Sequence, residues 1–238
     1  MWNRAVLLIL LSWTLLAQTS RVPFVGCVTL GQIERLEAPK GVDETVRIDT
    51  SAAKRLAYYK GEVSSGILAP RGWHCLGLWG SSGPRLYVLR DPMDEQSFPL
   101  SGGITGPAIE VDDVTAESSG RYEVAQVIAR VFPAHWAFAK SIIDGLDDGT
   151  YYKFGPFQKD RLIVQTDRLV RYRTPANSEG LGTMSLWKAN EDPVDGVAML
   201  QGPTPDLLML RVRLPRNLRD LAPVIIQQLL LRQRRDAR

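Results

Sequence analysis

The side chains best able to do chemistry gather in one glycine-rich stretch, Leu68–Gly83. A serine hydrolase needs a nucleophile, a general base and a group that orients the base. Ser81 or Ser82 could supply the hydroxyl, and His74 or His135 could supply the imidazole. The stretch lacks the G-x-S-x-G sequence of a nucleophile elbow. Its glycines are also typical of a simple hairpin turn over 77–83, which is the interpretation that we favour.

The two cysteines, Cys27 and Cys75, follow a segment typical of an export signal. Because oxidising compartments pair cysteines, we expect them to form a disulfide. Two other interpretations stay open. Phe24–Cys27 loosely matches a lipobox, in which Cys27 would carry a lipid. Cys75 could instead be a nucleophilic thiol, although strand neighbours point to opposite faces, which places His74 poorly to activate it.

Metal chemistry has little support in the sequence. The chain has two histidines and two cysteines, and they lack the close spacing of zinc motifs. A mononuclear site built from His74, His135 and a carboxylate remains as a minor alternative. The glycine-rich turn does not precede a clear helix, so a phosphate-cradling loop is also poorly supported. We therefore predict neither a metal nor a cofactor.

Residues 1–20 are typical of a secretory signal peptide. A short start with the charge of Arg4 leads into the apolar run Ala5–Leu16, and polar residues follow. That run is shorter than the roughly 20 apolar residues that span a bilayer. We therefore expect an exported protein, periplasmic or secreted. Its mature part, residues 21–238, should be one domain with a possible subdomain boundary near residue 146.

The composition is that of a folded domain: 45% of the 238 residues are hydrophobic and 23% are charged. A formal net charge of +3 argues against a general nucleic-acid binder. The basic residues are concentrated near the end of the chain, where Arg211–Arg238 contains eight arginines. No linker-like tract marks the possible subdomain boundary near residue 146.

The order of expected elements favours an α+β fold: a largely antiparallel sheet, a central helix pair and a C-terminal helix. Helices are expected at Ala52–Tyr59, Tyr122–Phe132, Ala134–Asp144 and Leu221–Arg232. Strands are expected at 42–48, 67–69, 73–78, 84–90, 108–114, 162–164, 169–172, 183–187, 196–200 and 208–214. The last of these alternates apolar residues with Met209, Arg211 and Arg213, the pattern of a strand with one buried face.

The final helix, Leu221–Arg232, has a broad apolar surface followed by arginines. Docking of this surface onto the core is the simpler interpretation. An amphipathic contact with anionic lipid is the alternative. This helix and a lipidated Cys27 are the two routes by which we expect any contact with a membrane.

Three segments resemble a family of uncharacterised exported bacterial proteins. They are Pro23–Cys27, Ala69–Cys75 with the Gly80–Gly83 turn, and Ala129–His135. The resemblance implies export and a Cys27–Cys75 bond, and it carries no activity, cofactor or catalytic residue with it.

The sequence as a whole therefore favours an exported cell-envelope protein, stapled by one disulfide, that binds an envelope partner or ligand or is a structural accessory. The alternative is an envelope hydrolase with a serine–histidine site at the turn 77–83.

Overall fold

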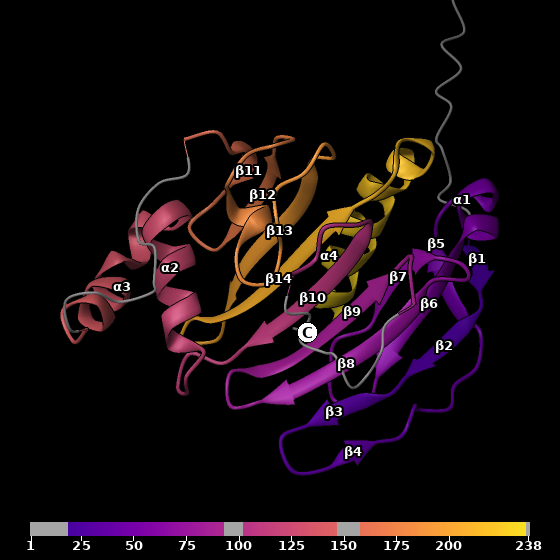
Figure 1. Ribbon diagram of the computed structural model, residues 1–238, viewed down its shortest axis with the longest axis horizontal. Helices are drawn as coiled ribbons and strands as arrows, with labels where there is room; N and C mark the ends of the chain where they lie inside the picture. Colours follow the sequence, from indigo (N-terminus) through magenta and orange to yellow (C-terminus); the bar gives the residue numbers. More distant parts are fainter. Residues whose placement is uncertain (1–18, 93–101, 147–157, 237–238) are drawn as a thin grey trace, which may run out of the picture.

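A nine-stranded sheet forms the middle of the fold (Figure 1). The computed structural model describes residues 19–92, 102–146 and 158–236. In spatial order the strands are β11 (Arg161–Gln165), β12 (Leu169–Thr174), β13 (Val194–Gln201), β14 (Asp206–Arg213), β10 (Ala108–Val114), β9 (Gly83–Leu89), β8 (His74–Gly80), β3 (Thr29–Gly31) and β4 (Arg35–Leu36). All neighbours are antiparallel except β3 and β8. The α+β class and the largely antiparallel sheet are thus confirmed.

Two smaller sheets lie at the end of the molecule shown on the right of Figure 1. One contains β2 (Phe24–Cys27), β6 (Leu56–Gly61) and β7 (Ile67–Pro70). The other is an antiparallel ribbon of β1 (Thr19–Val22) and β5 (Glu44–Arg47). Strand β1 includes Thr19 and Ser20, which the sequence assigned to the leader. Residues 1–18 lie outside the described residues.

Helices cover both faces of the large sheet. The helices of the fold are α1 (Thr50–Arg55), α2 (Arg121–Val131), α3 (Trp136–Ile143) and α4 (Ala222–Asp236), with 3₁₀ turns η2 (Pro133–His135), η3 (Leu181–Thr183) and η4 (Arg216–Leu221). On β14, Leu208 and Leu210 join the same core cluster as residues of α4, whereas Leu207 and Met209 join that of α2. Since neighbouring strand residues point to opposite faces, α4 and α2 cover opposite faces.

Strand β14 is therefore buried on both faces, and the expectation of one buried face was wrong. Met209, Arg211 and Arg213, which the alternation placed toward solvent, are 0% exposed. The reason lies in tertiary packing, because α2 and the chain around Trp187 cover the face that carries them.

The helix expected at Ala52–Tyr59 is confirmed only for its first half. Helix α1 ends at Arg55, and Leu56–Gly61 forms β6 between β2 and β7. The side chain of Asp49, rather than Thr50 or Ser51, caps the helix by accepting a hydrogen bond from Ala52 N at 2.9 Å. Every residue of β6 except Lys60 is buried. Because both faces of this segment pack against apolar neighbours, it forms a strand rather than a helix.

Two further boundaries differ from expectation. The segment Thr183–Trp187 is no strand: it begins at the end of η3, and Trp187 makes an isolated bridge to Ile104. The final helix begins at Ala222, directly after η4 in the sequence, and neither Asn217 nor Asp220 caps it. Asp220 instead forms an ion pair with Arg55 at 2.5 Å.

The helix pair α2–α3 and the C-terminal helix are confirmed, and so is the docking of α4 onto the core through Ile225, Ile226 and Leu229. Within the part of the chain that is described, no helix combines the length and the apolarity that a membrane crossing requires. Residues 147–157, beside the possible subdomain boundary, lie outside that part.

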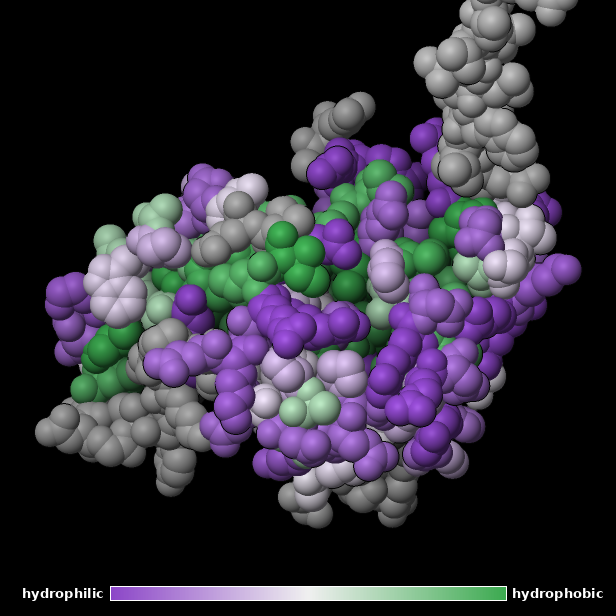
Figure 2. All heavy atoms as spheres, turned by 90° about the horizontal axis from the view of Figure 1, so that it is seen from above, coloured by the Kyte–Doolittle hydropathy of each residue, from purple (hydrophilic) through white to green (hydrophobic). Residues whose placement is uncertain are grey.

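The surface is unevenly polar. Seen from above, hydrophobic residues gather along the middle of the face, between hydrophilic margins (Figure 2). Large apolar side chains that are more than a third exposed include Trp79, Trp136, Leu162 and Ile163. Leu162 and Ile163 belong to β11, the strand at one edge of the large sheet.

Candidate functional site

The structure joins the two cysteines. The sulfurs of Cys27 and Cys75 form a disulfide that links β2 to β8, and the described residues contain no free cysteine. The predicted staple is therefore confirmed. A lipidated Cys27 and a nucleophilic Cys75 each require a sulfur that is not bound to the other, so both competing interpretations lose their reactive group.

The serine and histidine candidates are not brought together. His74 begins β8 and Ser81 follows its end, so the two residues are seven positions apart, or roughly 23 Å along an extended strand. The hydroxyl of Ser81 lies 2.8 Å from that of Ser119, just before α2. His135 lies beyond the other end of α2, a helix of 11 residues and so about 16 Å long.

The turn that carries the serines has a structural explanation. Gly83 has a φ of 110°, and a Cβ there would lie 2.0 Å from the carbonyl oxygen of Asp113. The carbonyl of Ser82 accepts a hydrogen bond from Thr115 N at 3.0 Å. The turn thus closes the β8–β9 hairpin and contacts the segment after β10, as a hairpin interpretation of 77–83 implies.

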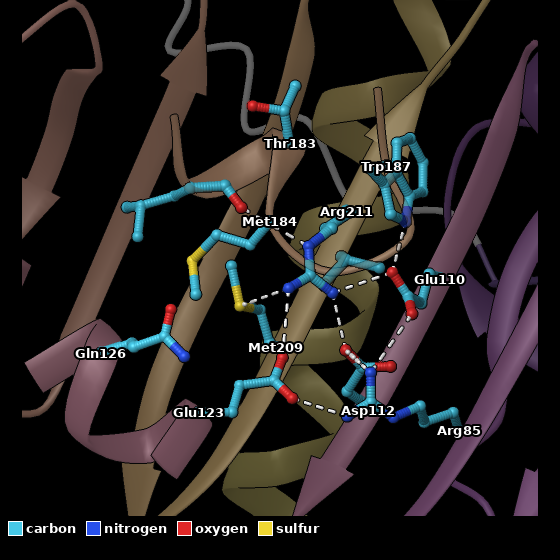
Figure 3. A network of polar contacts seen from close by, with 12 residues as sticks. Arg85, Glu110, Asp112, Glu123, Gln126, Thr183, Met184, Trp187, Met209 and Arg211 are labelled. Carbon is cyan, nitrogen blue, oxygen red and sulfur yellow. Dashed lines mark hydrogen bonds and ion pairs between the residues drawn. The ribbon is translucent and has the colours of Figure 1, made fainter. Parts of the chain in front are cut away.

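Sequence reasoning missed the main charged cluster of the fold. Figure 3 shows the Arg211 guanidinium surrounded by carboxylates on the sheet face beneath α2. The five members of this cluster, which we call the buried charge cluster, are Arg85 on β9, Glu110 and Asp112 on β10, Glu123 on α2 and Arg211 on β14. Arg211, Glu110 and Asp112 are 0% exposed.

Arg211 is the centre of this cluster. Its Nη1 donates to Glu110 Oε2 at 2.8 Å and to Asp112 Oδ2 at 2.6 Å. Its Nη2 donates to Glu123 Oε1 at 3.4 Å, and its Nε donates to the carbonyl of Leu181 at 3.4 Å. One guanidinium therefore contacts β10, α2 and the segment around η3 at once.

Arg85 supplies the second cation. Its Nη2 donates to Glu123 Oε2 at 2.5 Å. Its Nη1 lies 3.6 Å from Asp112 Oδ2 and 3.9 Å from Glu110 Oε1. Each buried carboxylate is thus flanked by two guanidiniums, which is the condition under which buried charge is tolerated.

The strand register creates these contacts. Glu110 is directly opposite Arg211 across the β10–β14 pair, and Asp112 is directly opposite Arg85 across the β10–β9 pair. Directly opposite residues share a face, with Cβ atoms about 5 Å apart. A one-residue slip of β10 would turn both carboxylates to the apolar face under α4, so the cluster also specifies the register.

The chain around Trp187, which covers this face of the sheet, also contacts the buried charge cluster. The indole Nε1 of Trp187 donates to Glu110 Oε2. The guanidinium of Arg213 lies 4.9 Å from the centre of the Trp187 ring and donates to the carbonyls of Ile104 and Lys188. Burial lowers the pKa of Arg213 to about 10, with nearby Asp192 opposing this shift.

The electrostatics favour one retained proton. Burial raises the pKa of Asp112 to about 7; the charge of Glu110 adds to the rise, and Arg85 and Arg211 oppose it. Burial disfavours the cation of Arg211, yet Glu110 and Asp112 hold its pKa well above the ordinary value. With a proton on Asp112, the two remaining carboxylates, Glu110 and Glu123, face two guanidiniums, and the cluster is neutral.

A carboxyl group that titrates near neutral pH suits general acid–base catalysis, which requires that the group reach the substrate. Here the three central side chains are 0% exposed, and Arg85 and Glu123 keep 14% of their side-chain surface. The ion pairs of the cluster therefore connect β9, β10, β14 and α2 inside the fold. Its signal in the sequence, charges alternating with apolar residues on two strands, also describes an ordinary solvent-facing strand.

The described residues contain no group of three or more His, Cys, Asp or Glu side chains arranged to hold a metal ion. No family model, curated protein or solved structure was found to match the chain. Any functional assignment therefore depends on the chain's own residues.

Proposed function

We propose that this chain is an exported protein of the cell envelope that acts by binding rather than by catalysis. The observation that carries the proposal is the Cys27–Cys75 disulfide. Structural disulfides persist in oxidising compartments and are rare where glutathione and thioredoxin keep thiols reduced. The apolar run Ala5–Leu16 behind a single arginine supports the same destination.

Two features favour binding over catalysis. The chemistry-bearing groups of the buried charge cluster contact one another rather than solvent, since Glu110, Asp112 and Arg211 are 0% exposed. The other candidates lie at separate places, since His74 is the first residue of β8 and Ser81 follows its last residue. A nucleophile and its base must lie within hydrogen-bond reach, about 3 Å.

Cell fractionation with thiol trapping tests the proposal. The full chain is produced in a bacterium, the cells are separated into cytoplasm, periplasm and membranes, and free thiols are alkylated before lysis. We expect the protein in the envelope fractions, with both cysteines alkylated only after reduction. The variant Leu8→Arg, which breaks the apolar run, should remain in the cytoplasm with two alkylatable thiols. Wild-type protein found in the cytoplasm with free thiols would overturn the proposal.

A further inference from the structure

A groove of about 670 Å³ lies between the β1–β5 ribbon and α4, away from the buried charge cluster. Its size is in the range of ligand-binding sites, roughly 300–1,000 Å³. The described residues that line it are Thr19, Thr45, Val46 and Arg47 from the ribbon and Gln228, Leu231, Arg234 and Arg235 from α4. We call this the arginine groove.

The two walls present their arginines for simple geometric reasons. In the ribbon, Thr19 is opposite Arg47 and Arg21 is opposite Thr45, and opposite residues share a face. Arg21 therefore lies on the same face as Arg47. On α4, Leu231 and Arg235 follow Gln228 by three and seven residues, a spacing that repeats on one helical face.

Among the described residues, none pairs with the arginines that line the groove. Arg47, Arg234 and Arg235 are exposed, and within the described part of the chain none of them has a hydrogen bond or ion pair from its side chain. The described lining residues include no carboxylate. Arg232 of the same helix is different, since it pairs with Glu44 at 3.0 Å and stacks over the Tyr58 ring at 4.0 Å.

These features suit an anion with oxygen acceptors, because the guanidinium fork matches phosphate geometry. The groove also offers apolar surface from the half-buried Leu231. A phosphate group joined to an apolar chain, as in a phospholipid, would contact both the arginines and this apolar surface.

We propose that the arginine groove binds the phosphate groups of anionic phospholipids and holds the domain at the membrane surface. This inference rests on the proposed function, because the groove must meet an envelope membrane. It also names a class of partner for the binding role.

Vesicle flotation of the protein purified from the cell envelope tests this inference. The readout is the difference in binding between vesicles of zwitterionic phosphatidylcholine and vesicles that also contain phosphatidylglycerol, because binding that does not depend on headgroup charge is equal in both. We expect stronger binding to the anionic vesicles, lost at high salt. Each arginine near an anionic surface contributes about fivefold to binding. The triple variant R47Q/R234Q/R235Q should therefore lose roughly 100-fold of the anionic preference, and Arg234→Gln alone about fivefold.

The matched control is K159Q/R161Q/R216Q, which removes three exposed cations outside the groove. It should bind anionic vesicles like the wild type. Equal binding of wild type to both vesicle types, or an equal loss in both triple variants, would overturn the inference. So would binding of inorganic phosphate as tight as vesicle binding, since the groove would then recognise free phosphate. These outcomes concern the groove alone, whereas fractionation tests export separately.

Discussion

Replacing Arg211 with methionine removes the cation that bridges Glu110 and Asp112. The remaining cation, Arg85, has its Nη1 3.6 Å from Asp112 and 3.9 Å from Glu110. Breaking a buried ion pair by removing one partner typically costs about 3–5 kcal/mol, because the other charge stays buried. We expect a loss of this size in the free energy of unfolding, and a fall in Tm of roughly 10 °C.

Urea unfolding followed by far-UV circular dichroism, with the disulfide kept oxidised, measures this change. The variant R211M/E110Q/D112N should recover most of the loss, because amides in place of the carboxylates leave no unpaired buried charge. The control Arg216→Met, at an exposed residue of η4, should change stability by less than about 0.5 kcal/mol. A cost below about 1 kcal/mol for Arg211→Met, or no recovery in the combined variant, would refute the reasoning that the cluster ties the layers together.

Three further predictions follow from single contacts. The pKa of Asp112 in the folded state, about 7, lies above its ordinary value of 3.8, so between these values the folded state binds a proton that the unfolded state has lost. The free energy of unfolding should therefore fall as pH rises from about 4 to 7. Asp112→Asn should flatten this slope in urea titrations across that range. Cys75→Ser should cost about 4 kcal/mol, because the disulfide closes a separation of 48 residues, and a loss below about 1 kcal/mol in chemical unfolding would contradict this estimate. A Cβ at Gly77 would lie 2.4 Å from Thr29 Oγ1, so Gly77→Ala should cost about 1–3 kcal/mol, with partial rescue by Thr29→Ala in a double-mutant cycle.

Local patterns in the sequence predicted the elements that local contacts decide. The helix expected at Tyr122–Phe132 is α2, Arg121–Val131, because its apolar residues recur at helical spacing and Pro133 ends it. The fold class and the disulfide were predictable for similar reasons: strands separated by glycine turns, and two cysteines behind an apolar leader. The exported location itself stays a prediction.

The buried charge cluster could not be predicted in this way. Alternation in β14 shows that Arg211 and Arg213 share a face, but it does not show whether that face meets water or another layer. The answer depends on α2 and on the chain around Trp187, which are distant in sequence. The arginine groove could not be predicted from the sequence for the same reason, because Arg47 and Arg235 are almost 190 residues apart along the chain.

The same limit explains the error at Leu56–Tyr59. A short apolar run is compatible with a buried helix or a buried strand, and local spacing does not separate them. Pairing of β6 with β2 and β7 decides the matter, and both partners are formed by other parts of the chain.

The intact mass of the protein recovered from the cell envelope, measured before and after reduction, tests the central claim most directly. The account predicts a chain that has lost its apolar leader and gains the mass of two hydrogens on reduction, as Cys27 and Cys75 separate. A chain whose mass is unchanged by reduction, or one that begins at Cys27 with added acyl mass, would contradict it.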